Sequence, residues 1–386
     1  MNKVRICHFQ LFYSELWFAF FFILLSQHLL FARKNDHFLE AHFFRGTILK
    51  HAPDIGHLIS GHPSGVLLGY NVQTKGGKEW HRAYRNPDYG FSFLYQDFKN
   101  ETLGDVYALS AHYNFYFLKR RFLFRISQGI GMATHPYDRE TNFKNNAFGS
   151  KFMSANMVLL QYQKRFSSIP LSFQTGFLFN HFSNGRTKFP NRGINTLAFQ
   201  LGFRYHLDEN KNEIPVNDSI LNVNEGIKFN LSLKSGINES PLVGIGQKPF
   251  YHLGFYADKR LGRKSALQLG VDMFWTLTLK DYIRYSSTAF PEKETQIDPN
   301  TDYKRVAVFV GHELFINQLS IETQLGYYVY RPFKEDIDIY QRVGLKYYYN
   351  RFLFSSLHLK SHAARAEAAE MGIGVRPAHM IIGDTM

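Results

Sequence analysis

The feature that most constrains this chain is an alternation of apolar and polar residues with a period of two, repeated along most of its length. In 106–118, tyrosine, leucine, alanine and phenylalanine occupy the odd positions, with serine, histidine and asparagine between them. The segments 122–130, 267–275 and 319–329 repeat the pattern. Because successive side chains of a strand point to opposite faces, each segment is predicted to be a β-strand with one apolar and one polar face.

Two all-β architectures accommodate such strands: a soluble sandwich that buries the apolar faces together, and a membrane barrel that turns them to lipid. The segments run to about 10 to 14 residues, as tilted membrane-spanning strands do. Aromatic residues make up 17% of the chain and crowd the strand ends, and short connections alternate with long ones, as in barrels with tight periplasmic turns and long outer loops. We therefore predict a transmembrane antiparallel β-barrel of the outer-membrane type.

The predicted barrel spans 33–377 and contains about 14 strands, with roughly 12 to 16 possible. The polar segment 208–225 divides the strands into two halves. We interpret it as a long turn within one barrel, because neither half has an obvious way to close its edges. A last strand is expected near 370–376, before a C-terminal tail at 378–386 that lacks the terminal aromatic residue usual in such barrels.

The N-terminus resembles an export signal. Lys3 and Arg5 precede an apolar core at 16–25, and a small residue, Ala32, follows at a suitable cleavage point. The alternative, a single transmembrane helix, needs a longer apolar run. We predict a cleavable signal peptide at 1–32 and export to the outer membrane of a Gram-negative bacterium. Cys7, the single cysteine, precedes the cleavage point, so the mature chain is expected to have no disulfide or thiolate site.

The formal net charge of +13 suits an acidic partner such as nucleic acid, anionic lipid headgroups or a phosphorylated glycolipid. The basic residues are spread over turns and loops and form no cluster on a helix, which excludes the usual nucleic-acid modules. The predicted partner is therefore a membrane lipid. The sequence carries no signal for an oligomeric state.

The stretch HFSNGRTKFPNRGIN, 181–195, joins two alternating strands and carries the candidate site. His181, Ser183 and Asn195 continue the apolar, lipid-facing rows of these strands. Two residues apart on one face, His181 and Ser183 have Cα atoms roughly 6.5–7 Å apart, which suits a base and a nucleophile. Asn195, on the next strand, is placed to orient the imidazole. The alternative is an ordinary hairpin loop with polar residues at the membrane interface.

The same loop offers supporting groups. Asn184 and the backbone N–H groups after Ser183 are candidate oxyanion donors, and Gly185 allows the backbone to turn. Arg186, Lys188 and Arg192 are candidate contacts for lipid phosphate, or solvated loop charges. We expect no metal site.

The spacing of His-x-Ser-Asn-Gly with Asn195 fourteen residues after the histidine resembles two groups of outer-membrane acyl hydrolases. Pro190-Asn191-x-Gly193 is similar to the lipid A 3-O-deacylase family, related to acyloxyacyl hydrolases, whereas Gly185-Arg186 and Asn195 are similar to outer-membrane phospholipase A. The segments GKEWHRAYRNPDYGFSF and NAFGSKFMSANM, 77–93 and 146–157, resemble the deacylase-related group. The resemblance is strongest over 40–207.

The resemblance implies Ser183 as nucleophile, His181 as general base and Asn195 as orienting residue, with Asn184 and Gly185 near the oxyanion. The deacylases carry Glu where this chain has Asn195. The implied function is a serine esterase that removes an ester-linked acyl chain from lipid A. One alternative is a phospholipase A acting on glycerophospholipids, a group in which calcium assists; here the loop has no acidic residue, so no cofactor is expected. Another is a non-catalytic porin-like or lipid-binding barrel.

Overall fold

The computed structural model describes residues 36–207, 225–242, 245–289, 297–363, 365–377 and 381–382. The predicted signal peptide, nearly all of the segment 208–225 and most of the tail lie outside the described residues. Contacts within the chain divide it into two compact units: one contains the strands of the first barrel, and the other contains the second barrel together with the segments 136–151 and 183–193. No helix in the described ranges is long and apolar enough to cross a bilayer.

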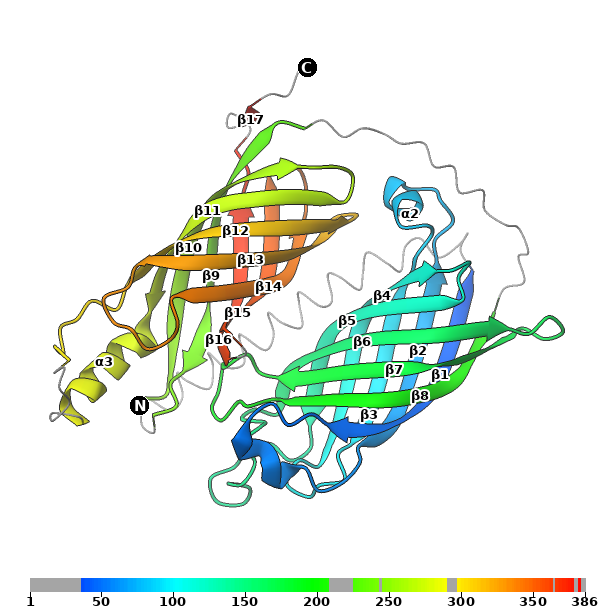
Figure 1. Ribbon diagram of the computed structural model, residues 1–386, viewed down its shortest axis with the longest axis horizontal. Helices are drawn as coiled ribbons and strands as arrows, with labels where there is room; N and C mark the ends of the chain where they lie inside the picture. The colour runs from blue at the N-terminus through cyan, green and yellow to red at the C-terminus, as the bar shows by residue number, and fades with distance from the viewer. Residues whose placement is uncertain are drawn as a thin grey trace, which may run out of the picture. The chain divides into compact units, whose positions relative to one another are not determined.

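The first barrel is a closed antiparallel sheet of eight strands (Figure 1). Its last strand pairs with its first, from the pair Phe38–His206 at one end to the pair Ile48–Thr196 at the other. Two short helices, η2 (Pro53–Leu58) and α2 (Glu79–Ala83), lie in its connections. The strands are β1 (His37–Ile48), β2 (Ser64–Gln73), β3 (Asp88–Asp97), β4 (Asp105–Phe117), β5 (Phe122–Ala133), β6 (Phe152–Arg165), β7 (Leu171–Ser183) and β8 (Ile194–His206).

The two faces of each strand differ as the alternation predicts. On β8, the outward residues Leu197 and Phe199 are 41% and 49% exposed, whereas the inward residue Gln200 is fully buried. Apolar side chains therefore cover the outside of the barrel and polar ones fill its interior, which is the pattern of a membrane barrel. The prediction of an outer-membrane-type barrel is confirmed, and the sandwich alternative is wrong.

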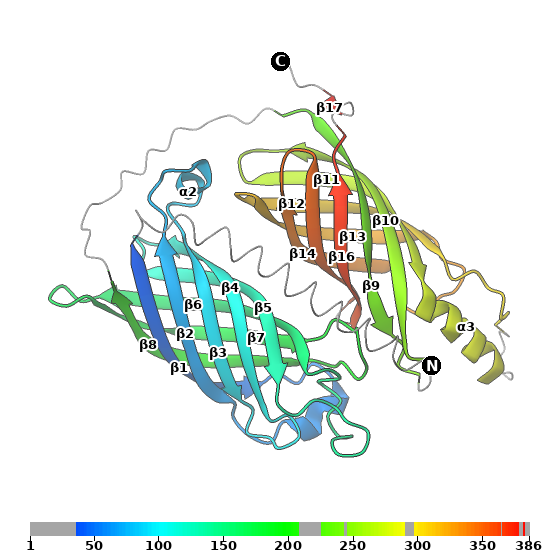
Figure 2. The same cartoon turned by 180° about the vertical axis from the view of Figure 1, so that it is seen from behind.

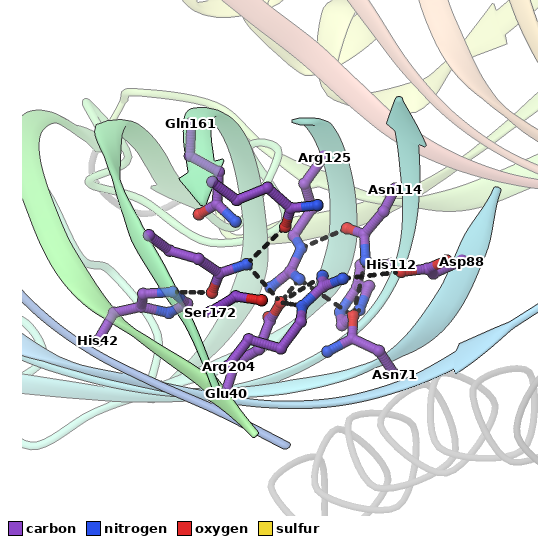
Figure 3. Close-up of polar contacts among 12 residues, drawn as sticks. Glu40, His42, Asn71, Asp88, His112, Asn114, Arg125, Gln161, Ser172 and Arg204 are labelled. Atoms are coloured by element: carbon purple, nitrogen blue, oxygen red, sulfur yellow. Dashed lines mark hydrogen bonds and ion pairs between the residues drawn. The ribbon is translucent and has the colours of Figure 1, made fainter. Parts of the chain in front are cut away.

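A buried network of charged side chains occupies the interior of the first barrel (Figure 3). Glu40 accepts from Arg125 Nη2 and from Arg204 Nη2, both at 2.5 Å. Arg204 also pairs with Asp88, and Arg125 donates to Asn114 over 2.6 Å. The interior of an eight-stranded barrel is just wide enough to be filled by side chains. The network therefore packs the barrel and pairs each buried charge.

The second barrel repeats this architecture with eight more antiparallel strands, closed by pairing between its last strand, β16, and its first, β9 (Figure 2). A helix, α3 (Leu277–Ala289), follows β11, and the short strand β17 (Ile381–Ile382) pairs with the start of β9. The strands are β9 (Ile227–Glu239), β10 (Gln247–Arg260), β11 (Ser265–Thr276), β12 (Arg305–Ile316), β13 (Leu319–Tyr330), β14 (Ile339–Tyr348), β15 (Leu353–His362) and β16 (Arg365–Val375).

Its interior is also filled by paired charges. Arg342 pairs with Asp272 at 2.5 Å and with Glu370 at 2.7 Å, and Lys346 pairs with Glu322 at 3.0 Å. Leu267 and Leu269 on β11 face outward, 51% and 64% exposed. Both barrels thus present apolar outer walls and packed interiors with paired charges, and the second also encloses a buried aromatic cluster that includes Tyr256, Phe274 and Tyr340.

The expectation of one barrel with about 14 strands is wrong, since the chain forms two barrels of eight. The interpretation of 208–225 as a turn inside a single barrel is wrong for the same reason: each half closes its own edges through its first strand. The alternation identifies strands and faces, but which distant strands pair depends on curvature and on the side chains that fill the interior. The last strand, β16, lies where one was expected, whereas α3 was not foreseen.

Candidate active site

The strands β7 and β8 carry the candidate site at the end where a long loop, 184–193, joins them. Phe177 pairs with Phe199, and His181 pairs with Asn195. Phe177 is 58% exposed and Phe199 49%, so these rows face outward from the barrel. His181 and Asn195 stand in the same rows, two positions beyond Phe179 and Leu197.

The side chains of His181 and Asn195 meet directly. Nδ1 of the imidazole lies 2.6 Å from Oδ1 of Asn195. Since an amide oxygen only accepts hydrogen bonds, Nδ1 is the protonated nitrogen of the neutral ring. Nε2 is then unprotonated and is the nitrogen that is able to accept a proton.

Ser183 is the last residue of β7 and is buried. It follows His181 by two positions and therefore belongs to the same face of the strand. Gly185, two residues further on, has a φ of 64°, a left-handed conformation that glycine adopts at little cost. The chain therefore turns sharply just after Ser183.

The hydrogen bonds of Asn184 lie within the loop region. Its backbone N–H donates to Asn191 Oδ1 over 2.9 Å. Its side-chain Nδ2 donates to the Lys188 carbonyl at 2.8 Å and to Ser150 Oγ at 3.0 Å. The Asn184 amides, expected as oxyanion donors, are thus engaged with the loop, and they hold its shape.

A second segment supports the loop. The N–H groups of Arg192 and Gly193 donate to the carbonyls of Asn146 and Ala147, at 3.1 and 3.2 Å. Gly149 lies so close that a Cβ there would be 2.3 Å from the Pro190 carbonyl oxygen. Sequence reasoning did not identify Ser150 or Asn191 as supports. The signals were the resemblances of 146–157 and of Pro190-Asn191-x-Gly193 to the deacylase-related group, which pointed to the segments without giving their contacts.

The three basic residues of the loop differ in their surroundings. Arg192 is exposed, whereas Arg186 and Lys188 are half-buried. Arg186, like Gly185, has a positive φ, of 69°. The carbonyl of Lys188 accepts from Asn184, so its backbone is part of the loop framework. In the described part of the chain, no group of three or more His, Cys, Asp and Glu side chains is arranged to hold a metal ion.

The apolar outer walls and filled interiors define a β-barrel protein of the outer-membrane type. The histidine–amide pair, at the end of β7 where the long loop begins, makes this a candidate hydrolase site. Residues 64–204 match the family described as lipid A 3-O-deacylase (PagL), and residues 227–379 match the family described as acyloxyacyl hydrolase, C-terminal domain. Each half of the chain is thus similar to one of these two related families, which confirms the resemblance to the deacylase-related group.

No curated protein matches the chain. Among solved structures, two variants of the Rhodopseudomonas blastica porin are 9% and 10% identical to it. Each alignment covers 88% of this chain and 99% of the porin, with TM-scores of 0.19 and 0.20. Scores this low carry no argument about this protein.

Proposed function

We propose that this protein hydrolyses an ester-linked acyl chain of lipid A in the outer membrane, with Ser183 as nucleophile, His181 as general base and Asn195 as orienting residue. The observation that carries the proposal is the 2.6 Å hydrogen bond between His181 and Asn195, in an outward row of the barrel. It supports a neutral ring whose Nε2 is unprotonated, on the face where lipid is available.

In the proposed reaction, Ser183 Oγ attacks the ester carbonyl carbon while His181 Nε2 takes the hydroxyl proton. The tetrahedral intermediate collapses, the C–O bond to the sugar breaks, and His181 returns the proton to the departing oxygen. Water, deprotonated by His181, then attacks the carbonyl carbon of the acyl-enzyme; the bond to Ser183 Oγ breaks, His181 returns the proton to Oγ, and the fatty acid leaves. Because the Asn184 N–H is engaged by Asn191, we assign the first oxyanion donor to the N–H of Gly185.

Asn195 is neutral, whereas the deacylases carry Glu at this position. An amide orients the imidazole but stabilises the imidazolium less than a carboxylate does. This departure keeps the phospholipase alternative open, since Asn195 and Gly185-Arg186 are shared with that group. A porin-like role is disfavoured by the paired charges that fill both barrels, such as Glu40 with Arg125 and Arg342 with Asp272.

The decisive experiment is the substitution Ser183→Ala. We expect the release of fatty acid from lipid A by the purified, detergent-solubilised protein to fall by at least about a thousandfold. Mass spectrometry of lipid A and of glycerophospholipids from the same reactions identifies the substrate. The control is Ser168→Ala, in the exposed turn between β6 and β7, which should leave the rate unchanged.

Retention of activity by Ser183→Ala would reject the serine mechanism. Loss of lysophospholipid products, with lipid A unaltered in both proteins, would support the phospholipase alternative instead.

A further inference from the structure

A shallow hollow of about 480 Å³ lies on the outer wall of the first barrel, over β1, β8 and β7. Phe177, Leu197 and Phe199 give it an apolar lining. Arg45 and His62 also line it. Arg45 pairs across the sheet with Phe199, which pairs in turn with Phe177. The hollow is therefore built from three adjacent strands in register.

The hollow lies next to the candidate active site along β8. Along β8 the outward row runs from Asn195 through Leu197 to Phe199, a span of about 14 Å at the usual rise per residue. The apolar lining thus begins one outward position beyond Asn195, the residue that contacts His181.

Arg45 is an unusual residue for this wall. It is exposed and lies in the outward row of β1, next to Phe43, which is 53% exposed. A lipid-facing arginine lowers the stability of a membrane barrel by about 2–4 kcal/mol at the bilayer midplane and by less near the interface. Among the residues that the structure describes, no carboxylate pairs with Arg45, in contrast to Arg125 and Arg204 inside the barrel, which share Glu40.

We propose that Arg45 binds a phosphate of lipid A while an acyl chain lies in the hollow over Phe177 and Phe199. This inference rests on the proposed hydrolase function and adds a subsite to it. The aliphatic stem of an arginine covers apolar surface while its head reaches toward the headgroup level. The guanidinium fork matches two phosphate oxygens. A phosphorylated glycolipid carries phosphates and acyl esters on one sugar frame, so a phosphate held by Arg45 fixes where the ester lies relative to Ser183.

The test measures binding separately from chemistry. In the Ser183→Ala background, native mass spectrometry of the detergent-solubilised full chain compares lipid A carrying its phosphates with dephosphorylated lipid A. We expect Arg45→Gln to weaken binding of the phosphorylated lipid about tenfold, as loss of a hydrogen bond to a charged group does, and to leave the dephosphorylated lipid unaffected. Arg45→Lys should lose less affinity for the phosphorylated lipid. The control, Lys164→Gln, removes an exposed charge of β6 outside the hollow.

In the active chain, the same Arg45→Gln substitution should raise KM for phosphorylated lipid A about tenfold and change kcat less than twofold, because Arg45 positions the substrate and touches no reacting atom. An unchanged affinity, or an equal loss for both forms of lipid A, would overturn the proposal. An equal loss for phosphatidylglycerol would overturn the assignment to lipid A.

Failure of this inference is distinguishable from failure of the proposed function. If Ser183→Ala retained activity, the serine mechanism would fall while the binding comparison still decided the role of Arg45. If Ser183→Ala were inactive and the Arg45 variants bound normally, only the phosphate subsite would fall.

Discussion

At the scale of the residue, the contact between His181 and Asn195 determines which ring nitrogen is able to act as a base. Its two members are fourteen residues apart in the chain and directly paired across two strands. The alternation alone predicted that both side chains share the outward face. The 2.6 Å contact itself depends on the register between β7 and β8, which a one-residue slip would destroy.

Asn195→Leu removes the hydrogen bond and leaves the imidazole free to adopt the other tautomer. We expect kcat to fall by about 10²–10⁴, the range seen when an orienting group of a triad is lost. Asn195→Asp keeps an acceptor at the same position and should retain most activity. The measurement is the initial rate of fatty-acid release from lipid A.

Thr175→Val, an outward substitution elsewhere on β7, serves as the control for a changed lipid-facing surface. Equal rates for Asn195→Leu and Thr175→Val would show that His181 needs no orienting partner.

At the scale of the element, the loop 184–193 has its own framework. Asn184 is held by Asn191, Lys188 and Ser150, and the segment around Gly149 packs against it. These partners come from the loop itself and from the connection between β5 and β6. Loop contacts of this kind follow no periodicity, so the sequence indicated neither Ser150 nor Asn191 as a support. The helix α3 was missed because the alternation describes strands only.

Gly149→Ala tests whether this framework supports catalysis. The added Cβ would lie 2.3 Å from the Pro190 carbonyl oxygen and 2.7 Å from that of Lys188, so the backbone of the loop must shift. We expect kcat on lipid A to fall at least about tenfold, since misplacement of a catalytic group by about 1 Å costs up to a hundredfold.

The matched control is Gly77→Ala, where an added Cβ meets no atom within 4 Å. Thermal unfolding should be nearly the same for both variants, because each change lies outside the strands. Full activity of Gly149→Ala would show that the loop adapts without disturbing Ser183.

At the scale of the whole molecule, two barrels replace the single barrel expected from the strand count. Each barrel encloses charged side chains that balance one another, as Glu40 does with Arg125 and Arg204. In the sequence these residues stand at the polar positions of separate strands, up to 164 residues apart. Their partners become evident only after the strands curve into a barrel.

Glu40→Gln keeps the size of the side chain and removes the carboxylate shared by two buried guanidinium groups. We expect the free energy of unfolding to fall by about 3–5 kcal/mol, the usual cost of breaking a buried ion pair. Urea unfolding in detergent micelles, followed by tryptophan fluorescence, gives this value.

Glu101→Gln, in the exposed turn between β3 and β4, is the matched control and should change the unfolding free energy by less than about 0.5 kcal/mol. A similar, small effect of Glu40→Gln would mean that water or other side chains replace the carboxylate inside the barrel.

The sequence by itself determined the strands, their inward and outward faces and the outward row that holds His181, Ser183 and Asn195, because side-chain direction in a strand is a local property of the backbone. The tertiary structure alone decided that β1 closes on β8 and β9 on β16, that Asn184 is engaged by Ser150, and that Arg45 stands beside Phe177 and Phe199. Each of these depends on pairing between residues far apart in the chain, which no local pattern specifies.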